Sequence, residues 1–224
     1  MENESVNKSG SESRTLKATI ILLSPLFVNA VSLTVAHIFK PIWEVWAWVP
    51  GILIYWMIIS FLILWGGGKT SIRKWLGPSQ GRWGWAVLAL ILALPPLQMF
   101  LTKGYLLKGI SIWLPWLLLG LINPFLEEGY WRGLVLDSAA NWSKWLAVSF
   151  SSAFFTLNHL VGLGATSIAC RNPVFLANVF IIGIIFGIIY YKTRSLRWLI
   201  LSHGLTDLFS LSVPVFLNLY IPPR

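Results

Sequence analysis

Long apolar runs dominate this sequence, and they restrict what the chain can fold into. Seven runs are each long enough, as helices, to cross the roughly 30 Å hydrocarbon core of a bilayer. They cover residues 18–39, 45–65, 84–101, 110–137, 144–161, 174–191 and 196–219. Only eight residues are acidic, which is too few charges to give a water-soluble domain a polar surface. The sequence therefore predicts an all-α, polytopic transmembrane helical bundle of about seven to eight spans, and it excludes a water-soluble enzyme.

The basic residues and the single cysteine indicate which partners and sites the protein can have. The 17 Lys and Arg residues are scattered between the apolar runs, whereas a nucleic-acid-binding protein gathers them in a patch. The single cysteine, Cys170, excludes a disulfide scaffold and any site built from several cysteines, and we interpret it as an incidental loop thiol. We therefore expect the lipid bilayer as a partner and no nucleic acid.

Hydropathy divides the chain into three parts. Residues 1–17 form a polar tail, residues 18–101 hold three N-terminal spans, and residues 102–224 hold the remaining spans. Cytoplasmic segments of membrane proteins carry an excess of Lys and Arg. A cytoplasmic N-terminus places all but five of the basic residues on the inner side; those five are Lys40, Lys103, Lys108, Arg171 and Arg224. We expect a multi-pass protein of a bacterial plasma membrane with its N-terminus in the cytoplasm.

The acidic residues fall into two groups. One group lies in the tail, in a loop or at the end of a run, and consists of Glu2, Glu4, Glu12, Glu44 and Asp137. The other group, Glu127, Glu128 and Asp207, lies within apolar runs. A charged side chain at the bilayer centre costs about 2.5–3.5 kcal/mol on insertion scales, so we interpret these three as candidate functional residues.

The depth of the polar side chains indicates where the fourth predicted helix ends. If this helix continues to Asp137, Glu127 lies about 15 Å from its end at 1.5 Å per residue. By the same rule, His159 lies about 24 Å along the fifth helix, and His203 and Asp207 lie about 10 and 16 Å into the seventh. A helix that ended before the glutamates would leave them at the surface, far from His159. We therefore predict one helix through the glutamate pair to Asp137.

Helical spacing separates the roles of the two glutamates. Glu128 and Arg132 are four residues apart with the acid first, the favourable order for an ion pair on a helix. Glu127 points about 100° away and has no local partner in this interpretation, so it is the better candidate for chemistry. Pro124 removes a backbone hydrogen bond just upstream, which can kink the helix and free a carbonyl group.

Two further segments carry the same spacing. Phe155 and His159 lie on one face of the fifth predicted helix, and we interpret Phe155 as packing that shapes the site. His203 and Asp207 share a face of the seventh helix. Asp207 can accept a hydrogen bond from His203 and hold one tautomer of its ring, as carboxylates do for histidines in catalytic and metal sites.

Together these segments resemble the CPBP family of intramembrane proteases, which includes type II CAAX prenyl proteases and bacteriocin-processing or self-immunity (Abi-like) proteins. The family pattern is Glu-Glu-x-x-x-Arg, then Phe-x-x-x-His, then His-x-x-x-Asn or Asp, on successive membrane helices. The residues that match it are Glu127, Glu128, Arg132, Phe155, His159, His203 and Asp207. The resemblance covers about residues 110–210.

The resemblance implies an intramembrane endopeptidase that acts on a membrane-associated protein or peptide. The implied catalytic residues are Glu127, Glu128, His159, His203 and Asp207. Glu127, helped by His159, would activate a water molecule for attack on the scissile carbonyl, and the residues of the third motif would stabilise the oxyanion. Glu128 would be neutralised by the structural partner Arg132.

Asp207 departs from family members that have Asn, because an ionised carboxylate cannot donate a hydrogen bond to an oxyanion. Asp207 could orient His203 as the donor, or it could be protonated in a dry site. A zinc ion held by His159, His203 and Asp207 is the third arrangement. We favour the metal-free arrangements, because the sequence has no His-Glu-x-x-His motif.

Two other functions are consistent with buried acids and histidines. A proton- or ion-coupled transporter uses such groups as a relay, although the chain is small and has no visible inverted repeat. A non-catalytic membrane immunity or scaffold protein could carry Glu127, Glu128 and Arg132 as a salt-bridge cluster. Convergence of all three motifs at one depth favours the protease.

Overall fold

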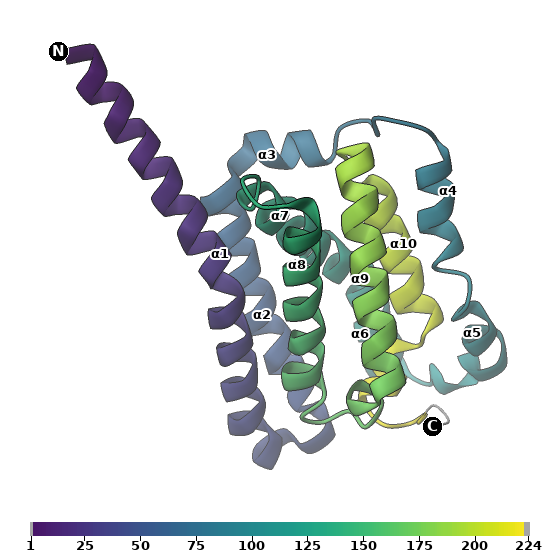
Figure 1. Ribbon diagram of the computed structural model, residues 1–224. Coiled ribbons are helices and arrows are strands. Elements are labelled where there is room, and N and C mark those ends of the chain that lie inside the picture. Colours follow the sequence, from purple (N-terminus) through teal and green to yellow (C-terminus); the bar gives the residue numbers. More distant parts are fainter. Residues whose placement is uncertain (1, 222–224) are drawn as a thin grey trace.

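The structure is a computed structural model that describes residues 2–221, with side chains described from Thr15 onward. All regular structure in this range is helical, as the sequence predicts. The polar tail predicted for residues 1–17 begins with residue 1, which lies outside the described residues. From Glu2 onward, the tail forms the first turns of α1 (Glu2–Trp43). The side chains of the tail up to residue 14 also lie outside the described part of the chain. α2 (Trp48–Leu62) returns beside α1 in the opposite direction (Figure 1).

Four helical stretches are long and apolar enough to cross a membrane: Thr15–Trp75, Ile110–Ser138, Lys144–Leu163 and Pro173–Thr193. The protein is therefore an integral membrane protein built from helices. The first stretch contains two predicted spans, because the chain reverses direction between α1 and α2 and ends in α3 (Gly68–Trp75), which lies across the end of the bundle (Figure 1). The count of seven to eight spans is not confirmed.

Two of the predicted spans are not continuous helices. The run 84–101 contains α4 (Gly84–Ile91) and α5 (Leu97–Lys103), which are separated at a pair of prolines that have no N–H to continue a helix. The run 196–219 contains α10 (Arg197–Phe209) and α11 (Ser212–Phe216), separated at Leu211, whose φ is 51°. α10 is about 20 Å long at 1.5 Å per residue, shorter than the hydrocarbon core.

The predicted helix through the glutamate pair is present. α6 (Ile110–Glu127) continues into a π-helical turn, η4 (Glu128–Leu134), and then into α7 (Val135–Ser138). Ser151 donates a hydrogen bond to the carbonyl of Trp131 in this turn over 2.8 Å. The helix therefore carries the glutamates into the protein interior rather than ending in front of them.

Two further helices complete the region around the glutamates. α8 (Lys144–Asn158) is followed by a second π-helical turn, η5 (His159–Leu163), and α9 (Pro173–Thr193) packs beside α8. Ser143 and Asn172 cap the N-termini of α8 and α9 with their side-chain oxygens. Short turns connect the rest: η1 (Glu44–Ala47), η2 (Ile63–Gly67), η3 (Gly104–Leu106) and η6 (Ala169–Arg171).

The contact between α6 and α10 sets the position of the third motif. Pro124 has no N–H to bond the carbonyl of Gly120 one turn earlier, and this carbonyl faces Gly204 of α10. A Cβ atom at Gly204 would lie 2.8 Å from the Gly120 oxygen, and one at Gly120 would lie 2.5 Å from Leu208 Cδ2. The two helices therefore approach closely because both contact positions are glycine, which places His203 beside the glutamates.

We predict that Gly204→Ala lowers the free energy of unfolding by about 1–3 kcal/mol, the usual cost of forcing an extra carbon into a packed interior. The added methyl group meets backbone, which cannot rotate away. Thermal or denaturant unfolding in detergent micelles measures the change. Gly84→Ala is the matched control, because nothing lies within 4 Å of the added carbon at that position; equal losses in both variants would contradict the prediction.

Candidate active site

Glu128 is the most deeply buried acidic side chain of the candidate site, with no exposed surface. Its Oε1 atom accepts a hydrogen bond from Arg132 Nη1 over 3.0 Å and another from His203 Nδ1 over 2.8 Å. The Arg132 guanidinium also lies over the ring of Phe155, 4.3 Å from its centre. Glu128 is thus held between Arg132 and His203, and Arg132 is the partner that the four-residue spacing predicts.

The structure shows which carboxylate accepts the hydrogen bond of His203. The sequence spacing allowed Asp207, four residues later, to accept it, and in the structure His203 Nδ1 donates to Glu128. Its other nitrogen, Nε2, lies 3.5 Å from Glu127 Oε2 and 3.7 Å from Asp207 Oδ1, which are ion-pair rather than hydrogen-bond distances. The carboxylate that fixes the ring of His203 is therefore Glu128, which lies 75 residues away in the chain.

Glu127 has partners that sequence reasoning missed. Asn123 Nδ2 donates to Glu127 Oε2 over 3.1 Å and also approaches Asp207 Oδ2 at 3.3 Å. Trp56 Nε1 donates to the Asn123 oxygen over 2.9 Å, so the nitrogen of this amide faces the two carboxylates. Asn123 therefore holds Glu127 and Asp207 at a fixed separation.

Tyr55, which lies on α2 next to Trp56, is a second partner of Glu127 that the sequence did not indicate. Its hydroxyl oxygen accepts a hydrogen bond from Trp131 Nε1 over 2.8 Å, which leaves its own proton free to interact with Glu127. The i, i+4 spacing of Asn123 and Glu127 is a signal that could have identified Asn123. Tyr55 and Trp56 carry no such signal, because aromatic residues in an apolar run are typical of any membrane helix.

His159 shares a cavity with Glu127. Its Nδ1 donates to the carbonyl of Phe155 over 3.0 Å, so in the neutral ring Nε2 carries the free lone pair. His159, Glu127 and Tyr55 line one cavity of about 30 Å³ between α1, α2 and η5. A cavity of this size, with the polar groups of Glu127, His159 and Tyr55 on an otherwise largely apolar wall, can hold a water molecule.

Phe155 lies at the centre of the cluster, as its spacing from His159 indicates. Its ring centre is 4.6 Å from that of His159 and 6.2 Å from that of His203, with both pairs edge to face. Arg132 covers the same ring. Phe155 therefore separates the two histidines and fixes the direction of each ring by packing.

A metal centre was one of the arrangements considered from the sequence. Among the side chains described between Thr15 and Ile221, no group of three His, Cys, Asp or Glu residues is placed to hold a metal ion. The Nδ1 atoms of His159 and His203 are both engaged in hydrogen bonds.

Two residues outside the cluster, Asp137 and Cys170, have defined surroundings in the structure. Asp137 accepts hydrogen bonds from Trp75 Nε1 and the Tyr190 hydroxyl and lies 3.5 Å from Lys74 Nζ, so it ties α7 to α3 and α9. Cys170 is fully buried, and burial raises the pKa of its thiol to about 12. A thiol with this pKa is a poor nucleophile.

The fold and the site define a polytopic helical membrane protein with buried carboxylates and histidines gathered at one place. Residues 109–209 match the model of the family described as Type II CAAX prenyl endopeptidase Rce1-like. This region runs from the residue before α6 to the end of α10, so it contains all three motifs, and the match supports the resemblance to intramembrane proteases. Neither the search of curated proteins nor the search of solved structures found a match.

We predict that Arg132→Ala lowers the free energy of unfolding by about 3–5 kcal/mol, because it leaves the charge of Glu128 buried with one partner fewer. Unfolding in detergent micelles measures this loss. Adding Glu128→Gln to Arg132→Ala should recover part of it, since the stranded charge is gone while an acceptor for His203 remains.

Lys74→Ala provides the matched control, because the Lys74 side chain is 59% exposed in its pair with Asp137. Exposed pairs contribute about 0–1 kcal/mol. An Arg132→Ala protein as stable as the Lys74→Ala protein would show that the buried ion pair does not support the fold.

Proposed function

We propose that the protein is an intramembrane endopeptidase in which Glu127 activates a water molecule. The observation that carries this proposal is that Glu127 and His159 line the same small cavity, whereas Glu128 is already held by Arg132 and His203. The two glutamates thus have separate tasks: Glu128 holds the site together, and Glu127 faces the space where a water molecule can react.

Glu127 and His159 position the nucleophile from two sides. The lone pair on His159 Nε2 accepts a hydrogen bond from the water, because Nδ1 of the same ring donates to a backbone carbonyl. Glu127 accepts the proton that the water loses as its oxygen attacks the scissile carbonyl carbon. Asn123 and Tyr55 keep the Glu127 carboxylate directed towards the cavity.

His203 is the proposed donor to the tetrahedral intermediate. Both of its nitrogens face carboxylate oxygens, an arrangement in which both can carry protons, and Nε2 is the nitrogen nearer to Glu127. The oxyanion accepts from Nε2–H. Asp207 therefore needs no proton of its own: it acts as an acceptor from Asn123 and as a negative charge beside His203.

Glu127 returns the proton that it takes from the water molecule. When the intermediate collapses, the carbon–nitrogen bond of the peptide breaks and the protonated Glu127 returns its proton to the leaving nitrogen. The products are a carboxylic acid and an amine, and Glu127 is again ionised. Each of these steps uses groups of the chain and water, and none is routed through a metal ion.

The substrate class to examine first follows from the family. Its name refers to CAAX prenyl endopeptidases, so we propose a membrane-associated protein or peptide, with the C-terminal peptide of a prenylated protein as the first candidate. We also propose that the N-terminus lies in the cytoplasm of a bacterial cell, which places the basic helix α3 on the cytoplasmic side.

Glu127→Gln is expected to lower kcat at least about 100-fold, the lower end of what a positioned general base contributes, and to leave the fold intact. The Gln oxygen can still accept from Asn123. Cleavage of a fluorogenic prenylated peptide in proteoliposomes measures the rate. Glu44→Gln, which changes an exposed acid next to α1, should cleave like the unchanged protein.

Full turnover by Glu127→Gln would contradict the assignment of the base. Proton flux in the same proteoliposomes without cleavage of any substrate would favour a coupled transporter instead. Elemental analysis of active protein tests the metal-free mechanism separately. About one zinc per chain, together with inactivation by a chelator, would overturn it. Peptides trapped by the Glu127→Gln protein identify the substrate.

Trp56→Phe is expected to lower kcat roughly tenfold with little change in KM, because small displacements of a catalytic group cost one to two orders of magnitude in rate. The variant keeps the aromatic ring but removes the donor that orients Asn123. Trp83→Phe, at a side chain that is 79% exposed, is the control. An unchanged kcat in Trp56→Phe would show that the orientation of Asn123 does not matter for the reaction.

A further inference from the structure

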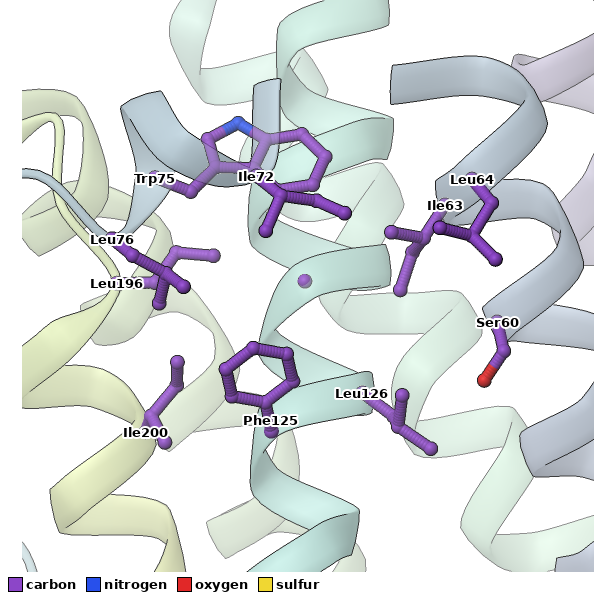
Figure 2. Close-up of a pocket in the computed structure, with 11 residues that line it drawn as sticks. Ser60, Ile63, Leu64, Ile72, Trp75, Leu76, Phe125, Leu126, Leu196 and Ile200 are labelled. Atoms are coloured by element: carbon purple, nitrogen blue, oxygen red, sulfur yellow. The ribbon is translucent and has the colours of Figure 1, made fainter. Parts of the chain in front are cut away.

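An apolar groove lies beside the catalytic cluster, between α2, α3, α6 and α10 (Figure 2). Its volume is about 180 Å³. Ile63 and Leu64 form one wall, Leu196 and Ile200 form the opposite wall, and Phe125 lies between them. Ser60 is the one lining residue with a hydroxyl group, and it lies on the α2 side of the groove (Figure 2).

The groove opens towards the surroundings of the helix bundle. Leu64 and Phe125, at its rim, are 62% and 43% exposed, whereas Leu196 on the inner wall is 1% exposed. Leu64 and Phe125 lie within the stretches that are long and apolar enough to cross the membrane. The opening is therefore formed by apolar side chains of segments that can cross a membrane.

The groove and the catalytic cavity are on opposite faces of the same helix. Phe125 and Gly129 line the groove, and Glu127 points about 160–200° away from them at 100° per residue. The groove and the cavity that contains Glu127 and His159 share no lining residue. An occupant of the groove would therefore not reach the proposed nucleophile.

α3 covers the groove with one face and presents positive charge on the other. Ile72 and Trp75 line the groove, while Lys69 and Arg73 are exposed. Lys74 is paired with a carboxylate, but among the described side chains no acid forms an ion pair with Lys69 or Arg73. An amphipathic helix of this kind lies in the headgroup region of a bilayer.

A third cation lies at the α10 side of the same rim. The side chain of Arg197 is exposed, and its Nε donates to the carbonyl of Leu76, a residue that lines the groove. Leu76 follows Arg73 by three residues, so Arg73 and Arg197 approach the end of the groove from α3 and α10. An apolar slot thus ends beneath a set of basic side chains that lack carboxylate partners among the described residues.

We propose that this groove binds one acyl chain of an anionic phospholipid, with its phosphate held by Lys69, Arg73 and Arg197. Apolar walls exclude water, and the surrounding bilayer supplies chains of the right width, whereas a protein helix about 10 Å across is too wide for a slot of this volume. The chain alone confers no selectivity among lipids, because all carry similar tails. The basic rim adds the preference for a negative headgroup.

Binding of phosphatidylglycerol and of phosphatidylcholine with identical acyl chains, measured by native mass spectrometry of the purified full-length protein, tests the proposal. We expect one phosphatidylglycerol to bind in preference to phosphatidylcholine. The double variant Lys69→Gln/Arg73→Gln should weaken phosphatidylglycerol binding by on the order of tenfold, since each basic residue near a membrane surface favours anionic lipid. Lys103→Gln/Lys108→Gln, which removes two positive charges elsewhere, is the matched control.

A second variant tests the groove itself. Ser60→Phe fills the slot from the α2 wall and should abolish the bound lipid, whereas Met57→Phe, at a 64% exposed position of the same helix, should not. Thermal unfolding confirms that both variants are folded; if Ser60→Phe is not, Ile200→Phe fills the slot from α10. No peptide substrate is present, so Glu127→Gln should bind the lipid like the unchanged protein whether or not the proposed protease function is correct.

Three results would overturn the proposal. Equal binding of both lipids would remove the role of the basic rim, and unchanged binding by the groove-filling variant would place the lipid elsewhere. Displacement of phosphatidylglycerol by a farnesylated peptide, lost in the groove-filling variant, would show that the slot takes the lipid chain of a substrate instead.

Discussion

The arrangement around Glu128 is the constraint on which the rest of the site depends. A carboxylate without exposed surface is tolerated only where cations and hydrogen-bond donors compensate the loss of water. Arg132 supplies one of these from the next turn of the same helix, and His203 supplies the other from α10. The position of α10 is therefore fixed by charge as well as by the close glycine contact with α6. Because Asp207 lies on α10, its position is fixed in the same way.

The same arrangement separates two adjacent glutamates into different environments. Glu128 accepts from two strong donors on one oxygen, while Glu127 accepts from the Asn123 amide and lines a cavity that also contains His159. Two like charges at neighbouring positions would otherwise destabilise each other. Because Arg132 and His203 neutralise one of them, the other can remain available for proton transfer, and this division is the physical basis of the proposed reaction.

Features that depend on local spacing could be predicted from the sequence. The helix through the glutamates followed from depth, and the contact of Glu128 with Arg132 followed from four-residue spacing. The partner of His203 did not, because the same spacing suggests Asp207 while the ring turns to a carboxylate on another helix. Tyr55 and Trp56 were also not predictable, since their contribution depends on how α2 packs against α6.

Hydropathy was informative about the membrane class and less so about the individual helices. An average over a window does not register the proline pair between α4 and α5, nor the left-handed backbone at Leu211. Both features end a helix through the geometry of the backbone, and neither lowers the hydropathy of the segment enough to be noticed in such an average. The two predicted spans that are not continuous helices lie where the chain remains apolar but the backbone cannot continue as a helix.

The π-helical turn Glu128–Leu134 has a consequence for how this chain can vary in length. In the wider turn, the residues on either side keep a rotational phase that an α-helix of the same length would not provide. Loss of a single residue there would turn the i→i+5 bonds into the i→i+4 bonds of an α-helix, so α7 would keep its direction and Asp137 its contacts with Trp75 and Tyr190. A deletion of one residue in this turn therefore leaves α7 in place, whereas an insertion is better accommodated by the surface loop between α3 and α4.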